Sequence, residues 1–167
     1  MSTPSTGPST GNHKSDAPHA GSHTQKDFLT IHIDGQMFGI PILQVQDVLG
    51  EIKVTRIPLA PPQVSGSLNL RGRIVTAIDV RKCLGLTPLE STDKRMSVVV
   101  IHDDELYSLI IDKVGDVLTL PERDFEQNPA TLDITWKSIS LGVYRLDGEI
   151  LVILDVPKLL LSLQHPH

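Results

Sequence analysis

The sequence predicts an all-β protein of two similar lobes that ends in a short C-terminal helix. Short runs rich in Val and Ile alternate with turn residues from residue 28 onward. No long amphipathic helix separates these runs, as it would in a parallel α/β sheet. Two stretches of the first half of the chain also recur in the second half. Aromatic residues make up only 4% of the chain, so we expect an aliphatic core.

The predicted strands follow one another closely. Residues 28–33 and 37–40 flank Asp34-Gly35, a pair that favours the tight turn of a β-hairpin. Two more hairpin turns are expected, at Asp103-Asp104-Glu105 and at Asp147-Gly148. Only residues 156–163 are expected to form a helix, because Pro157 suits a first helical position. The other strand candidates are residues 74–80, 98–102, 107–111, 114–120, 140–146 and 150–155.

The internal repeat predicts the two lobes. Residues 38–49 match residues 107–118 with five identities in twelve positions, and residues 72–84 match residues 148–160 with six identities in thirteen. Because Asp, Gly and Lys recur in the same order, the repeat indicates duplication and not only a shared apolar composition. A seam between two lobes is a usual place for a binding groove.

Composition excludes several other classes of protein. Residues 1–26 hold too few apolar side chains to fold and are predicted to be a disordered tail, whose histidines match no metal site. The net charge of −5 gives no support to nucleic-acid binding. A single cysteine, Cys83, allows no intramolecular disulfide and is expected to be buried. No leader peptide or apolar stretch long enough to span a membrane is present, so we expect a cytoplasmic protein without direct membrane insertion.

No enzyme is predicted. The chain has no nucleophile and base, metal triad or phosphate loop at recognisable spacing, so no catalytic residue, cofactor or metal is assigned. Asp79 and Asp155 each follow a strand and are expected to cap the next turn or helix. One alternative is a small-molecule-binding or hydrolytic β-barrel that uses Asp79, Asp112 or Asp155, which strongly raised carboxylate pKa values would favour. Another is a general SH3-like peptide-binding module, against which the low aromatic content counts.

Residues 64–75 are the strongest candidates for recognition. Gly66 and Gly72 permit a bulge or a tight turn, at which side chains can be presented outward. Arg71 has two interpretations that the residues alone leave equal. It could offer its planar fork of donors to a carboxylate of a partner, or it could pair with Asp47 or Asp79 within the fold.

Several motifs occur in the order found in CheW-like chemotaxis coupling (adaptor) proteins. They are Phe28-Leu-Thr-Ile, Phe38-Gly-Ile, Val45-Gln-Asp-Val, Val54-Thr-Arg-Ile-Pro58, Gly66-Ser-Leu-Asn-Leu-Arg-Gly72, Ile74-Val-Thr-Ala-Ile-Asp-Val-Arg81 and Ile111-Asp-Lys-Val-Gly-Asp-Val117. The resemblance spans residues 27–162 and implies two SH3-like β-barrel subdomains, roughly residues 27–95 and 96–162, before a short tail of residues 163–167. It implies a non-enzymatic adaptor that links the cytoplasmic tip of a chemoreceptor, a methyl-accepting chemotaxis protein, to the regulatory domain of the histidine kinase CheA.

The resemblance also implies a set of receptor-binding residues, of which Arg71 is the first candidate. The full set is Val45, Asp47, Gly66, Asn69 and Arg71. The kinase-contact residues stay unassigned. Three features depart from the family pattern: Asp47 stands where many relatives carry Glu, the segment from Pro58 to Pro62 is rich in proline, and residues 128–140 fit poorly.

Overall fold

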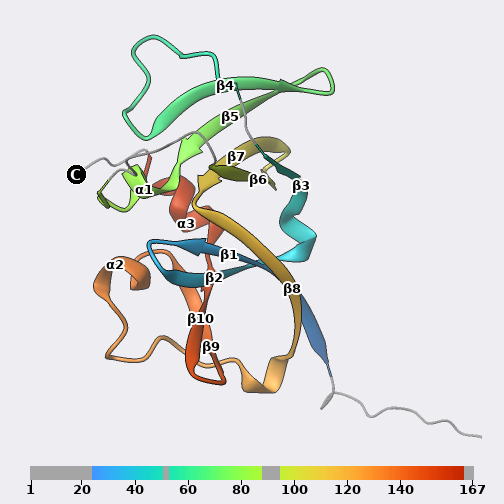
Figure 1. Ribbon diagram of the computed structural model, residues 1–167, viewed down its shortest axis with the longest axis vertical. Helices are drawn as coiled ribbons and strands as arrows, with labels where there is room; N and C mark the ends of the chain where they lie inside the picture. Colours follow the sequence, from blue (N-terminus) through green and yellow to red (C-terminus); the bar gives the residue numbers. More distant parts are fainter. Residues whose placement is uncertain (1–23, 51–52, 88–94, 164–167) are drawn as a thin grey trace, which may run out of the picture.

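Two five-stranded sheets form most of the structure. The computed structural model describes residues 24–50, 53–87 and 95–163. The first sheet has the strand order β8-β1-β2-β10-β9 and the second has the order β3-β6-β7-β5-β4; in Figure 1 the second sheet lies above the first. The strands are β1 (Gln25–Ile33), β2 (Gln36–Pro41), β3 (Val45–Leu49), β4 (Val64–Leu70), β5 (Arg73–Asp79), β6 (Met96–His102), β7 (Glu105–Ile111), β8 (Lys113–Pro121), β9 (Ser140–Leu146) and β10 (Glu149–Leu154).

The two sheets do not divide the chain at the expected boundary between residues 95 and 96. Strands β1 and β2 belong to the first sheet, β3 to β7 to the second, and β8 to β10 to the first again. The expected boundary therefore falls inside the second sheet. The physical reason is an exchange of strands between the two repeats, since β3 pairs with β6 and β8 pairs with β1.

The repeat in the sequence has a counterpart in the topology. When β6 to β10 are laid over β1 to β5, the order of the first sheet becomes the order of the second. Each sheet also contains one parallel pair at the same place, β2 with β10 and β5 with β7. Both observations support the duplication.

The outermost strands of each sheet approach each other without forming a continuous ladder. After β3 the chain makes one isolated bridge, from Thr55 to Ser67 of β4. After β8 it makes the matching bridge, from Glu126 to Val143 of β9. Within the described residues, each sheet therefore stays open between its two edges, which a single backbone bridge joins.

The central strands of each sheet have buried residues on both faces, which explains their nearly continuous Val and Ile runs. The largest apolar cluster lies between the sheets and includes Ile31, Phe38, Val100 and Leu109. A second cluster, around Phe28 and Tyr144, lies on the other face of the first sheet, and a third lies on the corresponding face of the second sheet. The sheets are thus held together by non-directional apolar packing over a broad area.

The hairpin turns confirm most of the expected positions. Asp34 and Gly35 both have positive φ angles, of 51° and 79°, as the two-residue turn favoured by Asp-Gly requires. The second turn is shorter than expected. It consists of Asp103 and Asp104, with φ angles of 50° and 64°, and Glu105 already belongs to β7. The third turn, at Asp147-Gly148, joins β9 to β10.

Within the described residues, two short helices and two 3-10 turns connect the strands, and a third short helix follows β10. They are α1 (Val80–Cys83), α2 (Ile134–Lys137), α3 (Val156–Leu161), η1 (Ile42–Gln44) and η2 (Glu122–Asp124). The predicted caps are confirmed: Asp79 accepts a hydrogen bond from the Lys82 amide, and Asp155 accepts one from the Lys158 amide. In the stretch that fits the family poorly, α2 places Trp136 edge-on against Phe38. No helix among the described residues is long and apolar enough to cross a membrane.

The expected tails need a correction at their inner ends. Residues 1–23 and 164–167 lie outside the described residues. Gln25 and Lys26, expected in the N-terminal tail, belong to β1, because their backbone pairs with Pro121 and Leu120 of β8. Leu163, expected in the C-terminal tail, packs against the cluster between the sheets.

Candidate functional site

The five predicted site residues all lie on the second sheet, at its two edges. Val45 and Asp47 are on β3, Gly66 and Asn69 are on β4, and Arg71 is in the turn between β4 and β5. The structure joins the two edges through an ion pair, in which Nη2 of Arg71 lies 2.9 Å from Oδ2 of Asp47. Arg71 therefore pairs within the fold with Asp47. Its side chain is still 76% exposed, so it is also open to a partner.

The turn that carries Arg71 is held by Asn69. Arg71 and Gly72 both have positive φ angles, of 51° and 85°, which forms a tight hairpin turn between β4 and β5. The side-chain oxygen of Asn69 accepts a hydrogen bond of 3.0 Å from the Gly72 amide. Asn69 thereby stabilises the conformation that presents Arg71, while Asp47 orients the guanidinium from the opposite edge of the sheet.

Gly66 is buried and Val45 is half-buried, and both have structural roles. Gly66 is buried at a φ of +148°, and an added Cβ would overlap the carbonyl oxygen of Thr55 and the side chain of Val54. This close approach lets the chain after β3 cross against β4. Val45 is half-buried, pairs with Val100 and packs against the cluster between the sheets. Of the predicted set, Asn69 and Arg71 are therefore exposed, and Asp47 is partly exposed.

One exposed apolar side chain belongs beside them and was missed. Ile74, on β5, is 76% exposed and stands directly opposite Asn69 in the strand pairing. Ile74 lies within the recognition segment of residues 64–75, but it was predicted only as the first residue of the strand candidate 74–80 and was given no role of its own. Its position just after the Arg71-Gly72 turn was the available signal. We call Asp47, Asn69, Arg71 and Ile74 the rim site.

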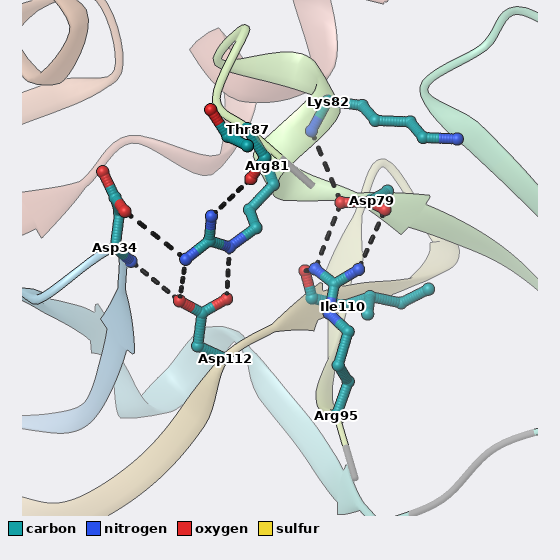
Figure 2. Close-up of polar contacts among 8 residues, drawn as sticks. All are labelled: Asp34, Asp79, Arg81, Lys82, Thr87, Arg95, Ile110 and Asp112. Atoms are coloured by element: carbon teal, nitrogen blue, oxygen red, sulfur yellow. Dashed lines mark hydrogen bonds and ion pairs between the residues drawn. The ribbon is translucent and has the colours of Figure 1, made fainter. Parts of the chain in front are cut away.

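A second polar cluster, around the buried Arg81, lies where the chain passes between the sheets and was also missed (Figure 2). Arg81, the second residue of α1, is only 6% exposed. Its Nε lies 2.8 Å from Oδ1 of Asp112, and its Nη2 lies 2.7 Å from Oδ2 of the same carboxylate. The guanidinium also donates to the carbonyl oxygen of Thr87 at 2.6 Å and reaches Asp34 at 3.5 Å. Such long-range pairs leave no periodic trace in a sequence.

The pKa values of this pair follow from its geometry. The hydrogen bond from Arg81 to Asp112 raises the pKa of the guanidinium, so Arg81 stays charged. Burial alone would raise the pKa of Asp112, but hydrogen bonds from Arg81 and from the Asp34 amide outweigh it, and the pKa is lowered. Asp112 is therefore an ionised structural carboxylate.

The three carboxylates of the hydrolytic alternative are engaged in structure. The pKa of Asp112 is lowered, whereas that alternative would be favoured by a raised value. Asp79 is bound by both terminal nitrogens of Arg95, at 2.9 and 3.1 Å, as Figure 2 also shows. Asp155 caps α3. Among the described residues, no group of three His, Cys, Asp or Glu side chains could hold a metal ion.

Known proteins resemble this chain over most of its length. Residues 27–164 match the family described as the CheW-like domain. The chain is 31% identical to the chemotaxis protein CheW of Bacillus subtilis over 106 residues, which cover 64% of this chain and 68% of that protein. It is 29% identical to the chemotaxis protein CheW of Klebsiella aerogenes over 143 residues, 86% of each chain. The crystal structure of the scaffolding protein TtCheW from Thermoanaerobacter tengcongensis matches with a TM-score of 0.70 and 25% identity, over 78% of this chain and 89% of that one.

Proposed function

The chain belongs to the CheW-like domain family, and from this premise we propose that it is a non-enzymatic adaptor that couples a chemoreceptor to a CheA-type histidine kinase. The observation that carries the proposal is the extent of the match. Residues 27–164 run from within β1 to beyond the end of α3, so both sheets and the rim site lie inside the matched region. The role places the protein in the cytoplasm, at the inner end of the receptors.

The rim site is the proposed receptor-binding surface. A receptor tip is helical in this proposal, and its apolar side chains would pack on exposed Ile74. The Arg71 guanidinium would donate to a carboxylate of the receptor, because a planar fork of donors matches a carboxylate in two hydrogen bonds. Asp47 and Asn69 would fix the direction of Arg71 through the contacts described above.

Each sheet is proposed to be an SH3-like barrel, and the kinase is proposed to bind on surfaces other than the rim site. The isolated bridges from Thr55 to Ser67 and from Glu126 to Val143 support this, since each draws the two edges of one sheet together. The ion pair of Arg71 and Asp47 draws the edges of the second sheet together as well. Coupling then proceeds through the relative placement of receptor and kinase, without a covalent step.

The rim site is tested by reversing the ion pair. Arg71→Glu places two carboxylates together and is expected to weaken binding to a receptor cytoplasmic fragment at least about tenfold, in line with the loss of a charge-assisted contact. The charge-swapped variant Asp47→Arg with Arg71→Glu restores an internal pair in the opposite polarity. If Arg71 contacts the receptor, this variant stays defective in titration calorimetry.

The matched control is Arg145→Glu. Arg145 lies on β9 of the first sheet, is similarly exposed, and pairs with Glu126 at 3.1 Å. This substitution makes the same change of charge and is expected to leave receptor binding unchanged. Full recovery of binding in the charge-swapped variant would contradict a direct contact by Arg71, and equal loss in the Arg145 variant would contradict the location of the site.

A further inference from the structure

The chain passes between the two sheets at only two places within the described residues. It leaves the first sheet through η1, between β2 and β3, and returns at Asp112, the single residue between β7 and β8. These two crossings are equivalent positions of the internal repeat, since residue 43 corresponds to residue 112. Any change in the angle between the sheets must be accommodated at these crossings.

Asp112 directly follows β7 of the second sheet and is hydrogen-bonded to the first sheet, whereas Arg81 belongs to the second sheet. The Asp112 amide donates to the carbonyl oxygen of His32 at 3.2 Å, and its Oδ2 accepts from the Asp34 amide at 2.8 Å. Arg81 follows β5 directly in α1, and its Nη1 is fixed by Thr87 in the segment after that helix. Arg81 therefore holds Asp112 and, through it, the turn at Asp34 between β1 and β2 against the second sheet; Figure 2 shows these three residues in contact.

Stability alone does not account for this contact. Apolar packing already holds the sheets together, and a buried ion pair is generally no more stabilising than apolar residues of the same volume. Apolar packing is non-directional, however, whereas a guanidinium bound to both oxygens of a carboxylate requires the two planes to be aligned. The ion pair therefore constrains the relative orientation of the two sheets, which the apolar contacts alone constrain little.

The other crossing, at η1, has no equivalent of the pair between Arg81 and Asp112. The repeat places Pro157 where the first copy has Arg81, and Leu43 where the second copy has Asp112. Leu43, in η1, is 91% exposed. One crossing is therefore held by a buried charge pair, and its equivalent carries an exposed apolar side chain.

We propose that Arg81 is a positioning residue that fixes the angle between the two sheets by clamping Asp112 at one of the two crossings. The untied crossing at η1 is the hinge about which the sheets turn when the clamp is removed. Because the rim site lies on the second sheet, the clamp sets how that site is oriented relative to the first sheet.

The clamp is tested by measuring the distance between the sheets without any partner. Spin labels are attached to the two cysteines introduced by Arg73→Cys and Glu149→Cys, in a chain that also carries Cys83→Ala. Both labelled positions are exposed, and they begin β5 and β10, one on each sheet. Arg81→Met with Asp112→Asn removes the clamp without leaving an unpaired buried charge. This variant is expected to shift or broaden the distance distribution measured by pulsed electron spin resonance.

The matched control is Arg95→Met with Asp79→Asn, which removes a similarly buried Arg–Asp pair that lies within the second sheet. It is expected to keep the distance distribution of the parent chain. If the first variant does not fold by circular dichroism, Asp112→Asn alone is measured with the same expectation. An unchanged distribution without the clamp, or an equal change in both variants, would overturn the proposal. Because no receptor or kinase is used, the result does not depend on the proposed function.

Discussion

At the scale of single residues, three arginines in similar ion pairs have different uses. Arg71 pairs with Asp47 in solvent, where such a pair contributes little to stability and leaves donors for a partner. Arg81 and Arg95 pair with Asp112 and Asp79 out of solvent, where the contacts are structural. Sequence alone left Arg71 equally open to a functional and a structural role, and the structure shows the internal pair with Asp47 while most of the Arg71 side chain stays exposed.

Gly66 gives the first prediction at this scale. Gly66→Ala forces a Cβ into the carbonyl oxygen of Thr55 at a strained φ, so we expect a loss of unfolding free energy of about 3 kcal/mol. Gly72→Ala is the control, since its φ is also positive but no atom lies within 4 Å of the new Cβ, and we expect about 1 kcal/mol. Urea denaturation measures both. Equal losses would show that the crossing near Thr55 is not tightly packed.

Cys83 gives the second prediction at the scale of single residues. Burial, and then the nearby charge of Asp79, raise the pKa of its thiol to about 12. At pH 8 only about one thiol in 10⁴ is then ionised, and the thiolate is the reactive form. We expect the folded chain to resist iodoacetamide at pH 8 and to react after unfolding in urea, with mass spectrometry as the readout. Alkylation of the folded chain at the rate of an ordinary free cysteine would contradict this.

At the scale of elements, sequence patterns predicted the hairpins better than the connections. Asp34-Gly35 and Asp147-Gly148 marked two turns, because Gly35, Asp34 and Gly148 take positive φ angles that few residues accept. The short helices α1 and α2 were not predicted, since four residues carry no amphipathic period. Gly66 was assigned to the site on resemblance, but its buried contact with Thr55 depends on a chain crossing that no local pattern reveals.

The helix caps allow a prediction about α1 and α3. Asp155→Ala removes only the cap of α3, for which we expect a loss of about 1 kcal/mol. Asp79→Ala removes the cap of α1 and also leaves buried Arg95 without its carboxylate, for which we expect about 3–5 kcal/mol. Thermal and urea unfolding of the two variants check the ranking. The reverse order would mean that the Arg95 pair is not maintained in solution.

At the scale of the whole molecule, the repeat predicted two similar units but not which strands form them. The sequence copies divide near residue 95, while β3 to β7 form one sheet and the two ends of the chain form the other. Strand exchange conserves the local pattern of every strand, so periodicity cannot distinguish an exchanged arrangement from two consecutive lobes.

This exchange predicts how the chain behaves when it is divided. Residues 24–94 contain β1 to β5 but neither β8 nor β10 for the first sheet, and residues 95–163 lack the complementary strands. Each fragment alone is expected to be unfolded by circular dichroism, and an equimolar mixture is expected to recover β structure. Independent folding of either fragment would contradict the exchanged topology.

Co-sedimentation tests the central claim, coupling of receptor to kinase, most directly. A receptor cytoplasmic fragment in an assembled form is mixed with the regulatory domain of a CheA-type kinase from the same organism, with and without this chain. We expect the kinase domain to enter the pellet only when the chain is present, and to return to the supernatant with Arg71→Glu. Kinase in the pellet regardless of the chain, or in the supernatant despite it, would contradict the adaptor role.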